Sequence, residues 1–179
     1  MLAVGILMLS YVAITLIGAR ISQDNSMLIL EKQIQEKEQH KAEQSAPPIR
    51  EGDVLGRIDI PRVGVSVAVL QGTTSQTLRL GVGHINGTAL PGEPGNMGIA
   101  GHRDTYFRAI KDIRKDDEIQ LQTAAGITRY EVDTIQTTFP SDISVLAPTA
   151  ESSLTLVTCY PFYYIGAAPK RFIVHAHKQ

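Results

Sequence analysis

The sequence predicts a mainly β domain, built as a barrel or a sandwich, behind an uncharged N-terminal segment. From Glu51 onward, short stretches of alternating apolar and polar residues are separated by turn residues, which is typical of β-strands. Few stretches in this region have helical periodicity, and many short strands with few helices favour these two architectures. The 179 residues suffice for one domain with its own core but not comfortably for two.

Composition excludes several classes of protein. Apolar residues make up 43% of the chain and charged residues 20%, as in ordinary globular proteins. The net charge of −1 gives no electrostatic reason to expect a nucleic acid as partner. The one cysteine, Cys159, excludes an intramolecular disulfide and a metal site made of cysteines alone. In an exported protein, a single thiol indicates either pairing with another molecule or a reactive group.

Residues 1–19 are predicted to be a transmembrane anchor. The run from Leu2 to Ala19 has no charged residue, and as a helix it would span about 27 Å, near the lower limit for a bilayer. A signal peptide is the main alternative, but a charged start is missing and residues 17–19 match a cleavage site poorly. A buried helix of a soluble domain is the other alternative. Arg20 follows the run, which by charge alone slightly disfavours an exported domain.

Residues 20–50 are predicted to be a helical or flexible stalk. The stretch from Glu31 to Gln44 is rich in Glu, Lys and Gln and has no glycine or proline, which favours an exposed helix. Pro47 and Pro48 then end any helix and begin an extended linker. Residues 51–179 form the predicted β domain.

The elements of this domain follow from periodicity. A short strand ending at His102 is predicted from the alternation that starts at Met97, and Ser75–Leu80 and Tyr106–Ile113 are predicted helices, the first capped by Thr74 or Ser75. The other predicted strands are Val54–Ile60, Val65–Leu70, Glu118–Gln122, Ile127–Thr138, Leu154–Cys159 and Arg171–Ala176.

Cys159 is predicted to lie at the end of a strand, beside a loop. Alternation places Thr158 on the face of Leu154 and Leu156, and Val157 and Cys159 on the opposite face. Pro161 ends regular pairing two residues later, so a substrate could reach the thiol. An inert, buried cysteine is the alternative, since free cysteines are often buried.

Two further segments carry candidate functional side chains. His102 ends a glycine-rich strand and precedes Arg103 and Asp104, where an imidazole can titrate; a structural histidine is the alternative. Arg171 shares a face with Ile173, outside the predicted core, and its guanidinium could hold an oxyanion. A surface arginine is the alternative there. His175 and His177 could chelate a metal, but no third ligand lies near them in the sequence, so no metal is expected.

Taken together, these segments resemble the sortases. The matching motifs are TLVTC ending at Cys159, GHRDT around His102 and PKRFIV around Arg171, in that family's order. The Cys-Tyr-Pro-Phe continuation is most similar to class D, with class E the near alternative, and no Asp-Pro-aromatic lid motif like that of class C is present. The resemblance covers about residues 54 to 177.

The resemblance implies an eight-stranded sortase barrel and an extracytoplasmic enzyme held at the cell membrane by its N-terminus. Cys159 would be the nucleophile, His102 the acid and base, and Arg171 the oxyanion clamp, with Val157, Thr158 and Ile173 contacting the substrate. The partners would be surface proteins with an LPxTG-like sorting signal and an amine of the cell envelope, such as a peptidoglycan precursor. No cofactor would be required.

Two other functions stay open on the sequence alone. An L,D-transpeptidase also uses cysteine and histidine on a β scaffold, but Val157 and Thr158 precede Cys159 where it would have Ser-x-Gly. A membrane-tethered β domain that only binds a partner, with Cys159 buried, is a second alternative. The thiol of such a module would react only after unfolding.

Overall fold

The computed structural model describes residue 28 and residues 31–36 and 48–179. The chain divides into two units, Met1–Pro48 and Ile49–Gln179, and residues 31–36 of the first are helical and exposed. Among the described residues, no helix is both long and apolar enough to span a bilayer. The predicted anchor, residues 1–19, and much of the predicted stalk lie outside the described residues. The three-part division of the chain therefore stays a prediction.

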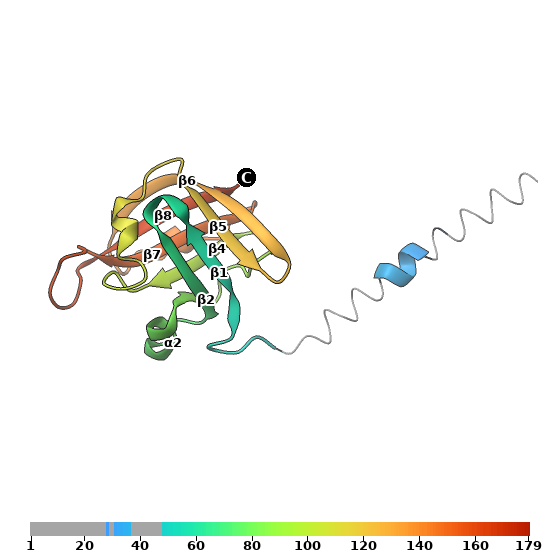
Figure 1. Ribbon diagram of the computed structural model, residues 1–179, viewed down its shortest axis with the longest axis horizontal. Coiled ribbons are helices and arrows are strands. Elements are labelled where there is room, and N and C mark those ends of the chain that lie inside the picture. The colour runs from blue at the N-terminus through green and yellow to red at the C-terminus, as the bar shows by residue number, and fades with distance from the viewer. Residues whose placement is uncertain (1–27, 29–30, 37–47) are drawn as a thin grey trace, which may run out of the picture. The chain divides into compact units, whose positions relative to one another are not determined.

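The second unit is a closed barrel of eight strands (Figure 1). Going around the barrel, the strand order is β1-β2-β3-β4-β7-β8-β6-β5. The predicted eight-stranded, mainly β barrel is confirmed. Its strands are β1 (Val54–Ile60), β2 (Val65–Gln71), β3 (Val82–His84), β4 (Asn96–Gly101), β5 (Glu118–Thr123), β6 (Gly126–Thr138), β7 (Ser153–Tyr160) and β8 (Lys170–Lys178).

The helices of the barrel unit are short. The helix α2 (Ser75–Leu80) is where the sequence predicts it, and the Thr74 hydroxyl caps it by accepting from the Thr77 amide at 3.3 Å. The predicted helix Tyr106–Ile113 is reduced to one 3-10 turn, η2 (Ala109–Asp112), with no side-chain cap. So short a segment has little helical stability of its own, and its path follows the burial of its apolar side chains. The other 3-10 turns are η1 (Pro61–Val63) and η3 (Ser144–Leu146).

The core fills the inside of the barrel. Every second residue of β7 and β8 points inward, with Leu154 and Leu156 facing the interior beside Val174 and Ala176. The connection from β4 to β5 adds Phe107, which is fully buried. Burying a side chain of this kind contributes about 1.5–3 kcal/mol. Because side chains alternate along a strand, Cys159 is left on the outer face of β7.

The pairing of β4, β7 and β8 brings three distant segments to one rim. β4 and β7 are parallel neighbours, with Gly101 opposite Thr158 at their last residues in register. β7 and β8 are antiparallel, so β8 begins where β7 ends. The barrel therefore gathers the end of β4, the end of β7 and the start of β8 at the same edge.

Candidate active site

Cys159 and Arg171 face each other across the last pairs of the β7–β8 ladder. The two residues are direct partners in the register, and both are half-buried. Directly opposite side chains of an antiparallel pair lie on one face, with their Cβ atoms about 4.5–5.5 Å apart. The thiol and the guanidinium therefore share the outer face at the rim.

His102 joins them from the other side of β7. It is the residue after β4, and Gly101 just before it pairs with Thr158, just before Cys159. The imidazole side chain is half-buried. The carbonyl oxygen of His102 accepts hydrogen bonds from the amides of Phe107 at 3.1 Å and Thr105 at 3.4 Å, which closes a turn. The structure thus brings the three predicted catalytic residues to one edge of the barrel.

Close packing fixes the backbone on which His102 is carried. A Cβ atom added to Gly101 would lie 2.6 Å from the ring of Phe107, closer than real contacts allow. Phe107 itself is fully buried, so the ring cannot move aside without opening the core. The absence of a side chain at 101 lets the His102 turn fold tightly over the barrel end.

Arg171 has donors left for a ligand. Its Nη1 donates to the main-chain carbonyls of Lys170 at 3.0 Å and Ala168 at 3.4 Å. Within residues 48–179, its Nε and Nη2 have no hydrogen-bond partner. A guanidinium held by its own loop and open on its other nitrogens can hold an oxyanion without rearranging.

Arg103 is a positioning residue that sequence reasoning missed. Its guanidinium donates to the carbonyls of Pro161 at 3.1 Å, Tyr164 at 2.7 Å and Gly166 at 3.1 Å, all in the β7–β8 connection. It also lies 6.0 Å from the centre of the Tyr164 ring. The residue after His102 thus holds the loop that separates Cys159 from Arg171. Its place next to His102 was the only sequence signal, because main-chain acceptors leave no pattern.

Two of the three residues predicted to bind substrate lie on the Cys159 face. Val157 and Ile173 are direct partners one pair further along the same face as Cys159 and Arg171. Val157 is half-buried and Ile173 is buried, although it lies outside the core cluster. Thr158 faces the interior, and its hydroxyl donates to the Gly101 carbonyl at 2.7 Å. Contact of Thr158 with substrate stays a prediction.

The same face ends in a polar cluster. Thr155 pairs with His175, with 3.0 Å between the hydroxyl and Nδ1, and Thr155 also donates to the Asn96 side chain at 2.7 Å. The Asn96 amide donates to the carbonyls of Val145 and Ala147, which fastens the β6–β7 connection to the sheet. Burial lowers the pKa of His175 despite the opposing charge of Asp133. A cavity of about 530 Å³ lies beside this cluster.

The remaining histidines of the barrel have structural partners. His84 is buried, and its two ring nitrogens lie 3.0 Å from the Gln71 side chain and the Ala89 carbonyl. His177 lies 2.7 Å from an Asp133 carboxylate oxygen. In the part of the chain that the structure describes, no group of three or more metal-ligating side chains of this kind comes together.

Comparison with known proteins identifies the family. The family model described as Sortase domain matches residues 58–179. The chain belongs to the sortase family. It is 34% identical over 128 residues to Sortase D of Bacillus subtilis, covering 71% of this chain and 65% of that one. The chain thus spans somewhat less than two thirds of the length of that relative.

Solved structures of sortases have the same fold. A Sortase D5 transpeptidase from Clostridium perfringens superposes with a TM-score of 0.68 at 36% identity, covering 80% of this chain and 88% of that one. Sortase C of Clostridium perfringens with the C-terminal cell wall sorting motif gives 0.67 at 30% identity, covering 73% of each chain. The predicted resemblance to the sortases, class D among them, is confirmed. The comparisons favour neither the binding module nor the L,D-transpeptidase.

Proposed function

We propose that this chain is a cysteine transpeptidase that cleaves a C-terminal sorting signal and transfers the acyl fragment to an amine. The observation that carries the proposal is the direct pairing of Cys159 with Arg171, at the rim where β4 delivers His102. A relative of the same fold has been solved with a cell wall sorting motif, which supports a sorting-signal peptide, of LPxTG type, as the first substrate.

In the first half-reaction, the Cys159 thiolate attacks the scissile carbonyl carbon. The oxyanion that forms is stabilised by the free Nε and Nη2 donors of Arg171. The His102 imidazolium gives its proton to the leaving amine as the C–N bond breaks. The products are a thioester on Cys159 and the released C-terminal fragment.

In the second half-reaction, the nitrogen of an acceptor amine attacks the thioester carbon. Neutral His102 takes the proton from that nitrogen, the C–S bond breaks, and Cys159 leaves as thiolate. Water in place of the amine gives hydrolysis instead of transfer. Neither half-reaction changes an oxidation state, so neither calls for a redox cofactor.

The enzyme works at the outer face of the cell membrane in this proposal. The uncharged run from Leu2 to Ala19 supports a single membrane-spanning anchor, and the acceptor is then an amine of the cell envelope, such as a peptidoglycan precursor. Protease treatment of intact cells tests this placement. The barrel should be digested from outside in wild type, while a chain lacking residues 2–19 should stay protected; a protected wild-type barrel would contradict the placement.

Peptide cleavage tests the activity itself. The full chain is incubated with a panel of quenched LPxTx peptides, and Cys159→Ala should abolish cleavage. His102→Ala should slow it about 10²- to 10⁴-fold, and Arg171→Lys about 10²- to 10³-fold. His177→Ala, an exposed histidine on β8, is the matched control and should cleave at the wild-type rate.

Alkylation separates this proposal from a binding module. A catalytic Cys159 should react with iodoacetamide in the folded protein, because the thiol is half-buried and not enclosed. If Cys159 reacts only in denaturant and no peptide is cleaved, the transpeptidase proposal is wrong.

A further inference from the structure

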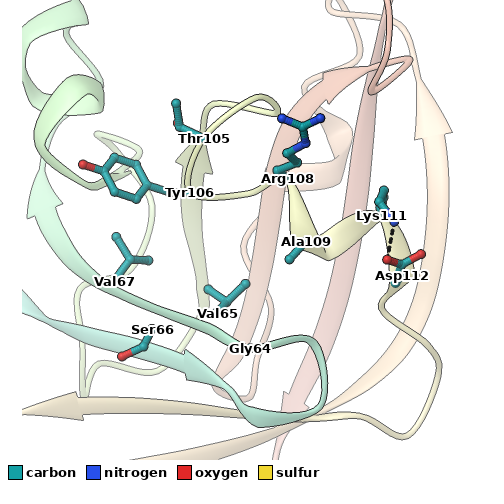
Figure 2. A pocket seen from close by; sticks show the side chains of 10 residues that line it. All are labelled: Gly64, Val65, Ser66, Val67, Thr105, Tyr106, Arg108, Ala109, Lys111 and Asp112. Atoms are coloured by element: carbon teal, nitrogen blue, oxygen red, sulfur yellow. Dashed lines mark hydrogen bonds and ion pairs between the residues drawn. The ribbon is translucent and has the colours of Figure 1, made fainter.

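The barrel is closed, but one of its strands, β2, is unpaired along part of one side, close to the His102 turn. β2 pairs with β1 along Val65–Leu70, but it pairs with β3 only from Val69 onward, because β3 has three residues. The first half of β2 therefore has no strand on its second side. Instead, the β4–β5 connection passes beside it, and between the two lies a cavity of about 390 Å³ (Figure 2).

This edge of β2 is not hydrogen-bonded through its backbone to the segment that lies beside it. Within residues 48–179, no main-chain hydrogen bond joins Val65, Ser66 or Val67 to the β4–β5 connection. An edge strand with free N–H and C=O groups is a ready template for an extended peptide. An extended main chain lying in the cavity would therefore run beside an unpaired strand edge.

The walls of the cavity are held in place. Arg62, in η1, donates to the carbonyl of Asp112 and, at 2.6 Å, to the carboxylate of Asp117. The Tyr106 hydroxyl donates to the Arg79 carbonyl in α2 at 3.1 Å. Ile110, in the β4–β5 connection, is buried in the core and anchors that connection. These contacts tie the β4–β5 connection to η1 and α2, so the residues around the cavity are fixed in place.

The lining combines an apolar floor with positive charge. Figure 2 shows Val65 and Ala109 between Tyr106 on one side and Arg108 and Lys111 on the other. Lys111 is paired with Asp112, whereas exposed Arg108 has no acidic partner within residues 48–179. Arg108 is close enough to Lys111 to oppose the rise in its pKa that hydrogen bonding to Asp112 causes. The cavity therefore favours a ligand with an anionic group.

The cavity also lies beside the turn that carries His102, which takes the proton from the acceptor amine in the proposed reaction. Its wall begins at Thr105, whose amide donates to the His102 carbonyl at 3.4 Å. In the proposed reaction, the acceptor amine must reach His102 after the first fragment has left. In the strand order, β2 and β3 lie on one side of β4, and β7 and β8, which carry Val157 and Ile173, lie on its other side. A ligand held along β2 would therefore approach His102 from the side away from β8.

We propose that this cavity binds the acceptor substrate, an extended peptide with a free amine and a carboxylate, which pairs with the edge of β2 and places its carboxylate on Arg108. The inference rests on the proposed transpeptidase activity and deepens it by naming the acceptor's site and chemistry.

Two acceptors that differ only in charge test the proposal. Ligation by the full chain is measured with triglycine and with triglycine amide, both at saturating sorting peptide. Wild type should have the lower KM for triglycine. Arg108→Glu should raise the KM for triglycine about tenfold or more, the effect of losing one charge-assisted hydrogen bond, and change the KM for the amide less than about threefold. Arg129→Glu, an exposed arginine on β6, is the matched control for charge and should change neither KM.

A second variant tests the cavity without touching charge. Ala109→Met places a longer side chain into the space beside Val65 and should raise the KM for both acceptors alike. If Arg108→Glu shifts both KM values equally, or neither, and Ala109→Met has no effect, the cavity is not the acceptor site.

A binding measurement keeps this inference separate from the activity. Triglycine is titrated into the ¹⁵N-labelled full chain with no sorting peptide present, so no reaction can occur. Saturable shifts confined to the amides of residues 65–67 and 105–112 support the site even if no peptide in the panel is cleaved. The absence of such shifts, together with unchanged KM values, overturns it while leaving a cleaving enzyme intact.

Discussion

The hydroxyl of Thr158 donates a 2.7 Å hydrogen bond to the carbonyl oxygen of Gly101, directly between the residues that precede Cys159 and His102. Both partners are buried. This bond ties the end of β7 to the end of β4, so the distance between thiol and imidazole is set from inside the barrel. The account therefore predicts that interior substitutions at this point affect the reaction.

Thr158→Val should lower kcat for peptide cleavage. Valine keeps the shape but loses the hydrogen bond, at a cost of about 1 kcal/mol in the free energy of unfolding. Thr155→Val is the matched control, since Thr155 is equally buried on the same strand but lies on the outer face, at the other end from Cys159. It should cost stability with kcat unchanged. Equal kcat values for the two variants would contradict the role given to Thr158.

Gly101→Ala should impair both folding and activity. The new methyl group would overlap the Phe107 ring, and overpacking of this kind costs about 1–3 kcal/mol. Thermal unfolding and peptide cleavage are measured together. The double variant Gly101→Ala/Phe107→Leu, which gives the methyl group room, should recover part of the lost activity. A single variant that is as stable and active as wild type would show that the turn tolerates a side chain.

Arg103→Lys should loosen the β7–β8 connection. Lysine keeps the charge but cannot reach three carbonyls as the guanidinium fork does. Because a hydrogen bond to a charged group contributes about 1.5–3 kcal/mol, the KM for sorting peptide should rise about tenfold. Limited proteolysis within residues 161–169 should also become faster. Arg79→Lys, in α2, is the control. If Arg103→Lys leaves the rate of proteolysis unchanged, Arg103 does not hold this connection.

Acid should weaken the barrel through Asp117. Hydrogen bonding from Arg62, aided by the Arg114 amide, holds the Asp117 pKa below its ordinary value of 3.8. The folded state thus favours the carboxylate, and this stability is present in full above that value and is lost as pH falls through the lower, folded pKa. Urea midpoints at about pH 7 and pH 3 measure the loss.

Asp117→Asn should remove that acid dependence. The variant should have a lower urea midpoint near neutral pH and a smaller further drop on acidification than wild type. Asp116→Asn is the control, because Asp116 is exposed and 3.9 Å from Lys115; it should behave as wild type. The same acid dependence in wild type and Asp117→Asn would show that other carboxylates dominate.

The sequence predicted those parts of the fold that depend on local alternation. The inward and outward faces of β7 and β8 follow from Leu154 to Cys159 and from Arg171 to Ala176, because one buried face imposes a period of two. β3 was missed, since Val82–His84 is too short to show a period and is buried by its neighbours. The helix expected at Tyr106–Ile113 shrank to η2 because burial of Phe107 and Ile110 decides the path.

The residues of the candidate site could be predicted from the sequence, but their arrangement in space could not. A strand end beside a glycine singled out His102, and a strand end singled out Cys159, the one cysteine of the chain. Their combination with Arg171 came from resemblance to a family. The pairing of Cys159 with Arg171 depends on the register between two strands joined by a loop, which no single segment encodes. The hydrogen bonds from Arg103 to the β7–β8 connection go to main-chain carbonyls. Every residue has such a carbonyl, so the amino-acid composition cannot indicate these contacts.

Intact-mass spectrometry of the full chain tests the central claim most directly. With a cleavable LPxTx peptide, the protein should gain the mass of the N-terminal acyl fragment at Cys159. Adding triglycine should remove that mass and yield a peptide joined to triglycine, and Cys159→Ala should give neither product. If wild type cleaves no peptide and gains no mass, while its folded thiol also resists alkylation, the three residues at the rim do not form a transpeptidase site.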